Sequence, residues 1–170
     1  MKYDFMVNIL FIYGAPGTGK TTISNLLNKK LKNSVLIDLG HLREFHLNAK
    51  WSNTTKKEEK MSFENLCFII KNYVKNRYKN IIVNDLLEEM IIQVPKIFKN
   101  YNYKIISLIV DDKELERRIN NPRDSGYKNV EKAVKWNNYL KKRQLLENET
   151  KIENSHNNPE ETVKKIIRKN

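Results

Sequence analysis

Residues 7–22 read VNILFIYGAPGTGKTT, an apolar run that ends at a glycine and is followed by a glycine-rich loop. The run from Val7 to Tyr13 predicts a strand buried on both faces of a sheet. After the loop, apolar residues recur at helical spacing from Ile23 to Leu31, which predicts a helix. A strand, a glycine-rich loop and a helix in this order form a phosphate site, because the loop and the helix N-terminus direct backbone N–H groups at an anion.

The spacing within the loop indicates a nucleoside triphosphate. Four residues separate Gly14 from the triplet Gly19-Lys20-Thr21. In this pattern the lysine contacts the β- and γ-phosphates, and the hydroxyl of the threonine is a ligand for Mg²⁺. We therefore expect ATP and Mg²⁺ to bind here. The predicted nucleotide-binding residues are Gly14, Ala15, Pro16, Gly17, Thr18, Gly19, Lys20, Thr21 and Thr22.

The composition limits the class of protein. The chain has 170 residues, which fits one domain over 1–170, and 39% of them are hydrophobic, which argues against disorder. No run approaches the roughly 20 apolar residues that a membrane-spanning helix needs. A single cysteine, Cys67, excludes an internal disulfide, so we expect a cytoplasmic protein. The net charge of +12 would suit an anionic partner, but the lysines are spread along the chain without a compact basic tract.

Short β-branched runs alternate with longer amphipathic stretches, which is typical of a parallel sheet covered by helices. Besides residues 7–13, strands are predicted at 34–37, 81–83, 104–110 and 152–154. Further helices are predicted over 41–49, 58–77, 112–120, 129–149 and 159–167, and one that begins near Pro95. The expected fold is a three-layer α/β/α sandwich with a five-stranded parallel sheet. Residues 121–128 are expected to form a mobile lid.

This order of elements, together with the loop from Gly14 to Thr21, resembles the small P-loop kinases. Members of this group are nucleoside monophosphate kinases, shikimate kinase, adenylylsulfate kinase and chloramphenicol phosphotransferase. The guanine-reading sequence Asn-Lys-x-Asp is absent, which disfavours a GTPase switch. The resemblance implies a P-loop NTPase fold of the nucleotide-kinase type and transfer of a phosphoryl group from ATP.

Asp38 and Arg43 are the predicted acceptor-binding residues. Asp38 ends the second predicted strand, where ligands bind in open α/β sheets. Its spacing from Arg43 is similar to the adenylylsulfate kinase pattern Asp-Gly-Asp-x-x-Arg, although Gly40 stands where that pattern has its second aspartate. A carboxylate there can accept the proton of the attacking hydroxyl, and an arginine can grip an anionic group. The alternative for Asp38 is an N-cap of the following helix.

Asp85 is a second candidate acid, because it follows the predicted strand over 81–83. At that position an acid can orient Mg²⁺ through water, so Thr21 and Asp85 are the predicted metal-binding residues. A cap or turn role is the alternative for Asp85.

Arginines flank the predicted lid. The resemblance implies that a lid closes over the phosphates and brings arginines to the transferring group, and that an arginine just before it stacks on adenine. Arg118 and Arg123 are the predicted catalytic arginines, whereas Arg117 could equally be a solvated helix residue. Residues 154–161 resemble the turn that lies against the nucleobase in these kinases, or else simply begin the last helix.

Together these residues predict an ATP- and Mg²⁺-dependent kinase. It would transfer the γ-phosphoryl group to a hydroxyl of a small, anionic acceptor such as a nucleotide or an adenylylsulfate-like metabolite. Lys20, Asp38, Arg118 and Arg123 are the predicted catalytic residues. A polynucleotide 5′-hydroxyl kinase is the second hypothesis, although no basic and aromatic platform for nucleic acid is evident. The third hypothesis is a non-enzymatic, ATP-dependent switch or assembly module. No membrane partner is expected, and the sequence indicates no oligomeric state.

Overall fold

The computed structural model describes residues 7–46, 55–121 and 127–168. Five strands form one sheet in the order β2-β3-β1-β4-β5, and every pair of neighbouring strands is parallel. The strands are β1 Asn8–Tyr13, β2 Ser34–Asp38, β3 Asn80–Asn84, β4 Tyr103–Ile109 and β5 Glu149–Glu153. The five-stranded parallel sheet that the sequence predicts is therefore confirmed.

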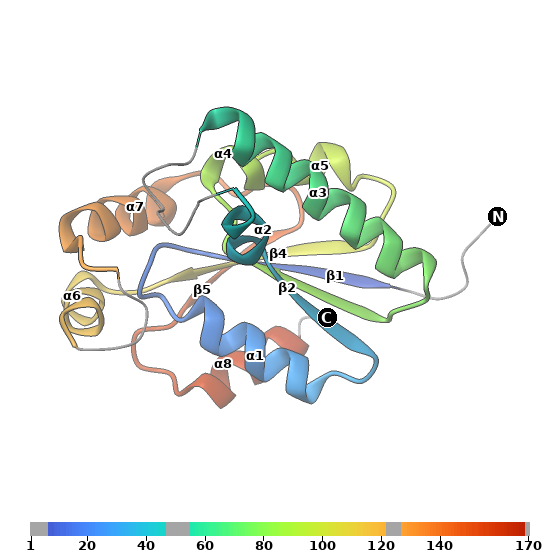
Figure 1. Cartoon of the computed structure of the whole chain (residues 1–170). Helices are drawn as coiled ribbons and strands as arrows, with labels where there is room; N and C mark the ends of the chain where they lie inside the picture. The colour runs from blue at the N-terminus through green and yellow to red at the C-terminus, as the bar shows by residue number, and fades with distance from the viewer. Residues whose placement is uncertain (1–6, 47–54, 122–126, 169–170) are drawn as a thin grey trace.

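Helices cover both faces of the sheet, which gives three layers (Figure 1). Helices α1 Lys20–Lys30 and α8 Pro159–Arg168 lie on one face, and α3 Lys56–Lys75, α4 Glu88–Ile91, α5 Val94–Ile97 and α7 Val130–Lys142 lie on the other. Two further helices, α2 Leu39–Glu44 and α6 Asp112–Asn120, each follow directly after a strand of the sheet.

The alternation of side chains along β1 explains why both faces are covered. Ile9, Phe11 and Tyr13 belong to the larger core, together with residues from α3 and α7. Leu10 and Ile12 point the other way, into the core that α1 and α8 complete. All five side chains are at most 1% exposed. A strand that is buried on both faces needs apolar side chains on both faces. The apolar run over 7–13 therefore predicted a central strand correctly.

The helix predicted over 129–149 is confirmed as far as Lys142 and is wrong over 143–149. Helix α7 ends at Lys142, and β5 begins at Glu149. Glu149 is 7% exposed and accepts hydrogen bonds from the guanidinium of Arg143 and from the backbone N–H of Leu146. A buried acid needs such donors, and forming them takes the chain out of the helix. Because the segment is polar throughout, the sequence pattern did not indicate where the helix ends.

Other helix boundaries also differ, and α3 and α8 differ from the predicted ranges by only one or two residues at an end. The helix predicted over 41–49 is α2, which begins at Leu39 and ends at Glu44. The helix predicted near Pro95 is α5, which has this proline in its first turn, and it is preceded by the separate short helix α4. Among the described residues, no helix combines the length and the apolar character needed to cross a membrane.

Candidate active site

The glycine-rich loop connects β1 to α1 at the carboxyl edge of the sheet. Thr18 closes a tight turn, since its backbone N–H and its hydroxyl both donate to the carbonyl of Ala15, over 3.3 and 2.8 Å. The ammonium of Lys20 donates to the same carbonyl over 3.3 Å. Thr21 and Thr22 are exposed in the first turn of α1. The carbonyl of Ala15 thus accepts hydrogen bonds from both Thr18 and Lys20, and the first turn of α1 is exposed to solvent.

Three predicted residues meet beside this loop. The ammonium of Lys20 lies 3.9 Å from a carboxylate oxygen of Asp85, and the side chain of Lys20 is only 11% exposed. Asp38 ends β2 opposite Asn84 of β3, so both acids stand at the carboxyl edge of neighbouring strands. Burial lowers the pKa of Lys20, while the charges of Asp85 and Asp38 act in the opposite direction. The sequence therefore located a lysine and two acids that the fold brings together.

Gly40 leaves space for the carboxylates of both acids. A Cβ atom at this position would lie 2.8 Å from Oδ1 of Asp38 and 3.4 Å from Oδ2 of Asp85. The space that the second aspartate of the adenylylsulfate kinase pattern would need is therefore taken up by these two carboxylates. Asp38 also accepts a hydrogen bond from the N–H of Gly40 over 2.8 Å and caps α2. The N-cap alternative for Asp38 is confirmed, and its catalytic role stays a prediction.

The residues predicted to bind metal, Thr21 and Asp85, carry oxygen atoms of the kind that bind a hard divalent cation. Burial raises the pKa of Asp85, the charge of Lys20 acts in the opposite direction, and the nearby charge of Asp38 adds to the rise. A cation at this carboxylate would offset both causes of the rise. The Asp85 carboxylate and the Thr21 hydroxyl are of the chemical type that Mg²⁺ prefers, so the residues present fit the metal.

Arg43 is not directed at an open acceptor site. It donates to Oε1 of Glu59 on α3 from Nε, over 3.0 Å, and from a second guanidinium nitrogen. The two side chains are 15% and 16% exposed. Nothing in the sequence distinguished Glu59 from the other acids of the helix between Lys56 and Lys75. The partner of Arg43 was therefore missed by sequence reasoning.

Arg118 joins the end of α6 to the loop after β5. Its guanidinium donates to Glu114 and to the backbone carbonyls of Asn154 and Ser155, over 2.7, 2.8 and 3.1 Å. Arg117 also binds Glu114 and is 58% exposed. Arg118 thus holds the turn that resembles the nucleobase-facing turn of these kinases or else begins the last helix. Arg123 and most of the predicted lid, at 122–126, lie outside the described residues.

Asn154 ties the same turn to the phosphate loop, and sequence reasoning did not single it out. Its amide nitrogen donates to the carbonyl of Thr18 over 2.9 Å, and its amide oxygen accepts from the hydroxyl of Thr162. Asn154 is 5% exposed, so both partners are shielded from water. An asparagine can supply a donor and an acceptor at once, which fits a residue that bridges β5, α8 and the loop.

Asn154→Ala is expected to lower the free energy of unfolding by about 2 kcal/mol, because two buried polar groups lose their partners. It should also weaken ATP binding, since the carbonyl of Thr18 is no longer held. Urea denaturation and calorimetric titration with ATP would measure the two effects. His156→Ala is the matched control on the same loop, because His156 is 89% exposed. Equal stability of the two variants would contradict the anchoring role.

A buried polar network lies beneath the phosphate loop, and the sequence did not indicate it. The hydroxyl of Tyr13 binds Glu88 and accepts a hydrogen bond from Trp136 over 3.1 Å. Glu88 also lies 3.3 Å from Arg143, which in turn binds Glu149. Because Tyr13 directly precedes Gly14, this network fixes the end of β1 from which the loop starts.

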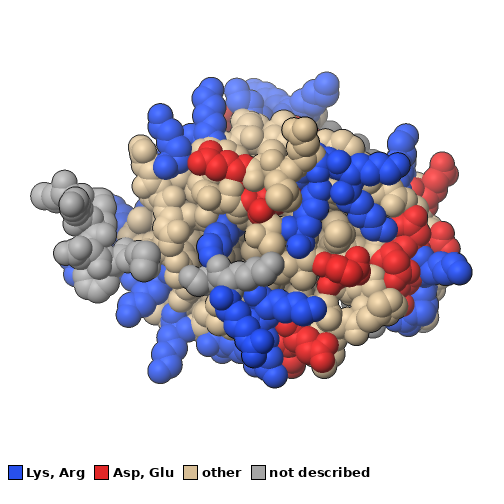
Figure 2. Space-filling model, turned by 180° about the vertical axis from the view of Figure 1, so that it is seen from behind, with Lys and Arg blue, Asp and Glu red and all other residues tan. Residues whose placement is uncertain are grey.

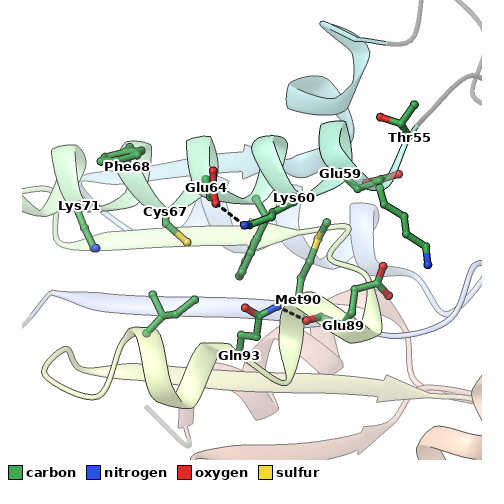
Figure 3. A pocket seen from close by; sticks show the side chains of 13 residues that line it. Thr55, Glu59, Lys60, Glu64, Cys67, Phe68, Lys71, Glu89, Met90 and Gln93 are labelled. Atoms are coloured by element: carbon green, nitrogen blue, oxygen red, sulfur yellow. Dashed lines mark hydrogen bonds and ion pairs between the residues drawn. The ribbon is translucent and has the colours of Figure 1, made fainter.

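A groove of about 890 Å³ opens between α3 and the α4–α5 segment (Figure 3). Phe63, Cys67 and Met90 are among the residues that line it. Thr55 and Glu59 stand at the end toward α2, and Lys71 stands at the other end. The groove therefore begins beside the Arg43–Glu59 pair.

Known structures share this fold at low sequence identity. One chain of the Pnkp1/Rnl/Hen1 RNA repair complex has a TM-score of 0.65 and 19% identity over 85% of this chain, which spans only 48% of that chain. The tunicamycin resistance protein of Deinococcus radiodurans has a TM-score of 0.72 and 13% identity, over 96% of this chain and 95% of that one. For the adenylylsulfate (APS) kinase CysC of Mycobacterium tuberculosis, in complex with AMPPNP and APS, the TM-score is 0.62, with 12% identity and 96% and 97% coverage.

These likenesses confirm the fold expected from the resemblance to small P-loop kinases. No curated protein sequence matches the chain. The family described as AAA domain matches residues 10–138, which include the phosphate loop, both acids at the sheet edge and most of α7. This match covers well over half of the chain. The chain therefore belongs to the AAA domain family and has the fold of the P-loop kinases.

Proposed function

We propose that the protein is a kinase that transfers the γ-phosphoryl group of ATP to a hydroxyl of a small acceptor. The observation that carries this proposal is the meeting of Lys20, Asp38 and Asp85 beside the phosphate loop. A cation for the phosphates and an acid for the acceptor hydroxyl are the two groups that phosphoryl transfer requires of a protein. A site that only bound phosphate would not need the acid.

Each residue has a defined role in this proposal. Backbone N–H groups of the loop and the N-terminus of α1 bind the phosphates, and Lys20 neutralises the charge that develops during transfer. Asp38 accepts the proton of the attacking hydroxyl. Thr21 and Asp85 would hold Mg²⁺, which would supply further positive charge at the transferring group. Arg118 positions the base-side turn, and Arg123 is proposed to act at the transferring group when the lid closes.

Asp38→Asn separates the catalytic role of Asp38 from its capping role. Asparagine is as good an N-cap as aspartate and keeps an oxygen for the N–H of Gly40, but it cannot take a proton. We expect the turnover number for phosphoryl transfer to fall by about 100-fold or more. The affinity for ATP and the melting temperature should stay near those of the unchanged protein. Transfer of ³²P from ATP, measured at saturating acceptor, provides the test.

The acceptor for this assay would come from a screen of nucleosides, nucleotides, sugars, adenylylsulfate, antibiotics and oligonucleotides. Asp38→Ala serves as the comparison, because it removes both the base and the cap. It should lose transfer and also some stability. Turnover of Asp38→Asn at the level of the unchanged protein would remove Asp38 from the mechanism.

A polynucleotide 5′-hydroxyl kinase is the second proposal, favoured by the likeness to a chain of an RNA repair complex and by the net charge of +12. On the face shown in Figure 2, however, lysines and arginines are scattered and acids lie among them. Binding to a single-stranded oligonucleotide that weakens steeply with salt would support this function. No binding at low salt would exclude it.

A further inference from the structure

The acceptor side of the site contains an arginine that is already bound to an acid. Arg43 donates two hydrogen bonds to the same carboxylate oxygen of Glu59. Both side chains are about 85% buried, since they are 15% and 16% exposed. Water and salt screen such a pair only weakly. The charge of Arg43 is therefore largely neutralised before any acceptor arrives.

The remaining charges at this edge do not favour an anion. The charges that act on Asp85 are those of Lys20, Asp38, Arg43 and Glu59. Together with Asp85 itself, these described residues comprise two cations and three acids. Lys20 is the cation nearest the phosphate loop and is needed for the donor. A phosphate or sulfate on the acceptor would add negative charge beside this cluster, whereas an uncharged hydroxyl compound would not.

The second oxygen of Glu59 indicates the same preference. Among the described residues, Oε2 is buried and has no hydrogen-bond partner. A buried carboxylate oxygen without a donor costs free energy, so native proteins seldom keep one unless another group completes it. A hydroxyl group can supply a donor to this oxygen. An ionised phosphate or sulfate ester group has only acceptor oxygens and cannot.

The groove next to Glu59 offers space for the body of such a compound (Figure 3). Its walls near this end include Phe63 and Met90, which are buried and apolar. Three lysines line the groove, Lys56, Lys60 and Lys71, and all are exposed. Lys60 faces Glu64 at 3.7 Å. Solvated lysines of this kind attract an anion far less than a buried arginine would.

We propose that the acceptor is an uncharged compound with several hydroxyl groups, and that Glu59 selects it against phosphorylated or sulfated compounds. Glu59 acts by holding Arg43 in the ion pair and by adding its own negative charge to the site. This inference rests on the proposed kinase function and names the substrate class of the same site. The anionic acceptor that the sequence predicted is the competing outcome.

The test compares each acceptor with two phosphorylated forms, so that any hydroxyl that reacts is free in at least one of them: a hexose with its 1-phosphate and its 6-phosphate, and a nucleoside with its 3′- and its 5′-monophosphate. The kcat/KM of ATP-dependent transfer is measured for the unchanged protein, Glu59→Gln and the control Glu64→Gln, whose carboxylate is on the same helix but exposed. The unchanged protein should prefer the uncharged member of at least one set over both of its phosphorylated forms by about tenfold or more. Glu59→Gln should reduce this preference at least about tenfold by releasing Arg43, and Glu64→Gln should leave it unchanged.

A double variant, Arg43→Gln with Glu59→Gln, distinguishes release of Arg43 from general damage. Without the arginine, the gain toward the phosphorylated acceptor should disappear, and melting temperatures would show that all variants fold. Three results would overturn the inference: a preference of the unchanged protein for a phosphorylated form, no change of preference in Glu59→Gln, or the same gain in the double variant. These leave the kinase function standing. Absence of ATP-dependent transfer to every acceptor in the screen would instead overturn the proposed function, and this inference with it.

Discussion

Lys20→Met is expected to reduce phosphoryl transfer by about a thousandfold or more, the largest effect on activity among the substitutions considered. Lys20 is the ammonium group at the phosphate loop, 3.3 Å from the carbonyl of Ala15 and 3.9 Å from Asp85. A charge held in place at 11% exposure interacts with developing negative charge more strongly than the same charge in water. Methionine has a similar length but no charge, so the loop should keep its shape.

Stability should move in the opposite direction from activity in this variant. Burial lowers the pKa of Lys20, which means that the folded chain disfavours the charged lysine. The side chain of Asp85 is 45% exposed, so its carboxylate has access to water after the lysine is removed, although its partial burial raises its pKa. We therefore expect the melting temperature without ligand to be equal or higher, and the increase on addition of ATP and Mg²⁺ to be lost. Differential scanning fluorimetry with and without nucleotide measures both.

Lys29→Met is the matched control for this prediction, because Lys29 is exposed in the last turn of the same helix. It should retain transfer and the stabilisation by ATP. Two results would contradict the role of Lys20: transfer within a few-fold of the unchanged protein, or an unchanged stabilisation by ATP. A large fall in melting temperature without ligand would show that the lysine is structural instead.

Features encoded by short stretches of sequence were predictable. The apolar run over 7–13 and the loop after it are local, because burial on both faces and a tight turn each constrain consecutive residues. Asp38 and Asp85 could be placed near Lys20 because parallel strands end at the same edge of a sheet. The sheet order then placed both carboxylates next to the space that a Cβ atom at Gly40 would occupy.

Pairings between distant residues were not predictable. Arg43 was expected to grip an anion, but it meets Glu59, which is 16 positions away on another helix. Asn154 reaches the loop across 136 positions. One position on a charged helix looks much like the next in a single sequence, and only the packing of the helices decides which acid faces the arginine. The acceptor side of a site is built from such pairings, whereas the phosphate side is built from one loop.

Gly14 is the position at which the phosphate loop is least tolerant of change, and Gly14→Ala is expected to destabilise the protein by about 3 kcal/mol or more. Its backbone has a φ of 149°, and a Cβ atom there would lie 2.7 Å from the carbonyl oxygen of Leu108 in β4. The same atom would lie 2.7 Å from the hydroxyl of Thr18, which closes the turn of the loop. A backbone carbonyl within the sheet cannot swing aside as a side chain can, so β1 and β4 would have to separate where they pair.

Gly17→Ala is the control for this prediction, because it tests a positive φ without the contact with β4. Gly17 also has a positive φ, of 84°, but the atoms nearest to a Cβ there would belong to the side chains of Ile119 and Leu115, at 3.0 Å. Side chains can adjust, so we expect a loss of only about 1–2 kcal/mol from backbone strain, with folding retained. Urea denaturation would rank the two variants, and calorimetry would show weaker ATP binding in both. If Gly14→Ala were as stable as Gly17→Ala, the contact with β4 would not be what restricts this position. Glycine at 14 would then be required by its backbone conformation alone.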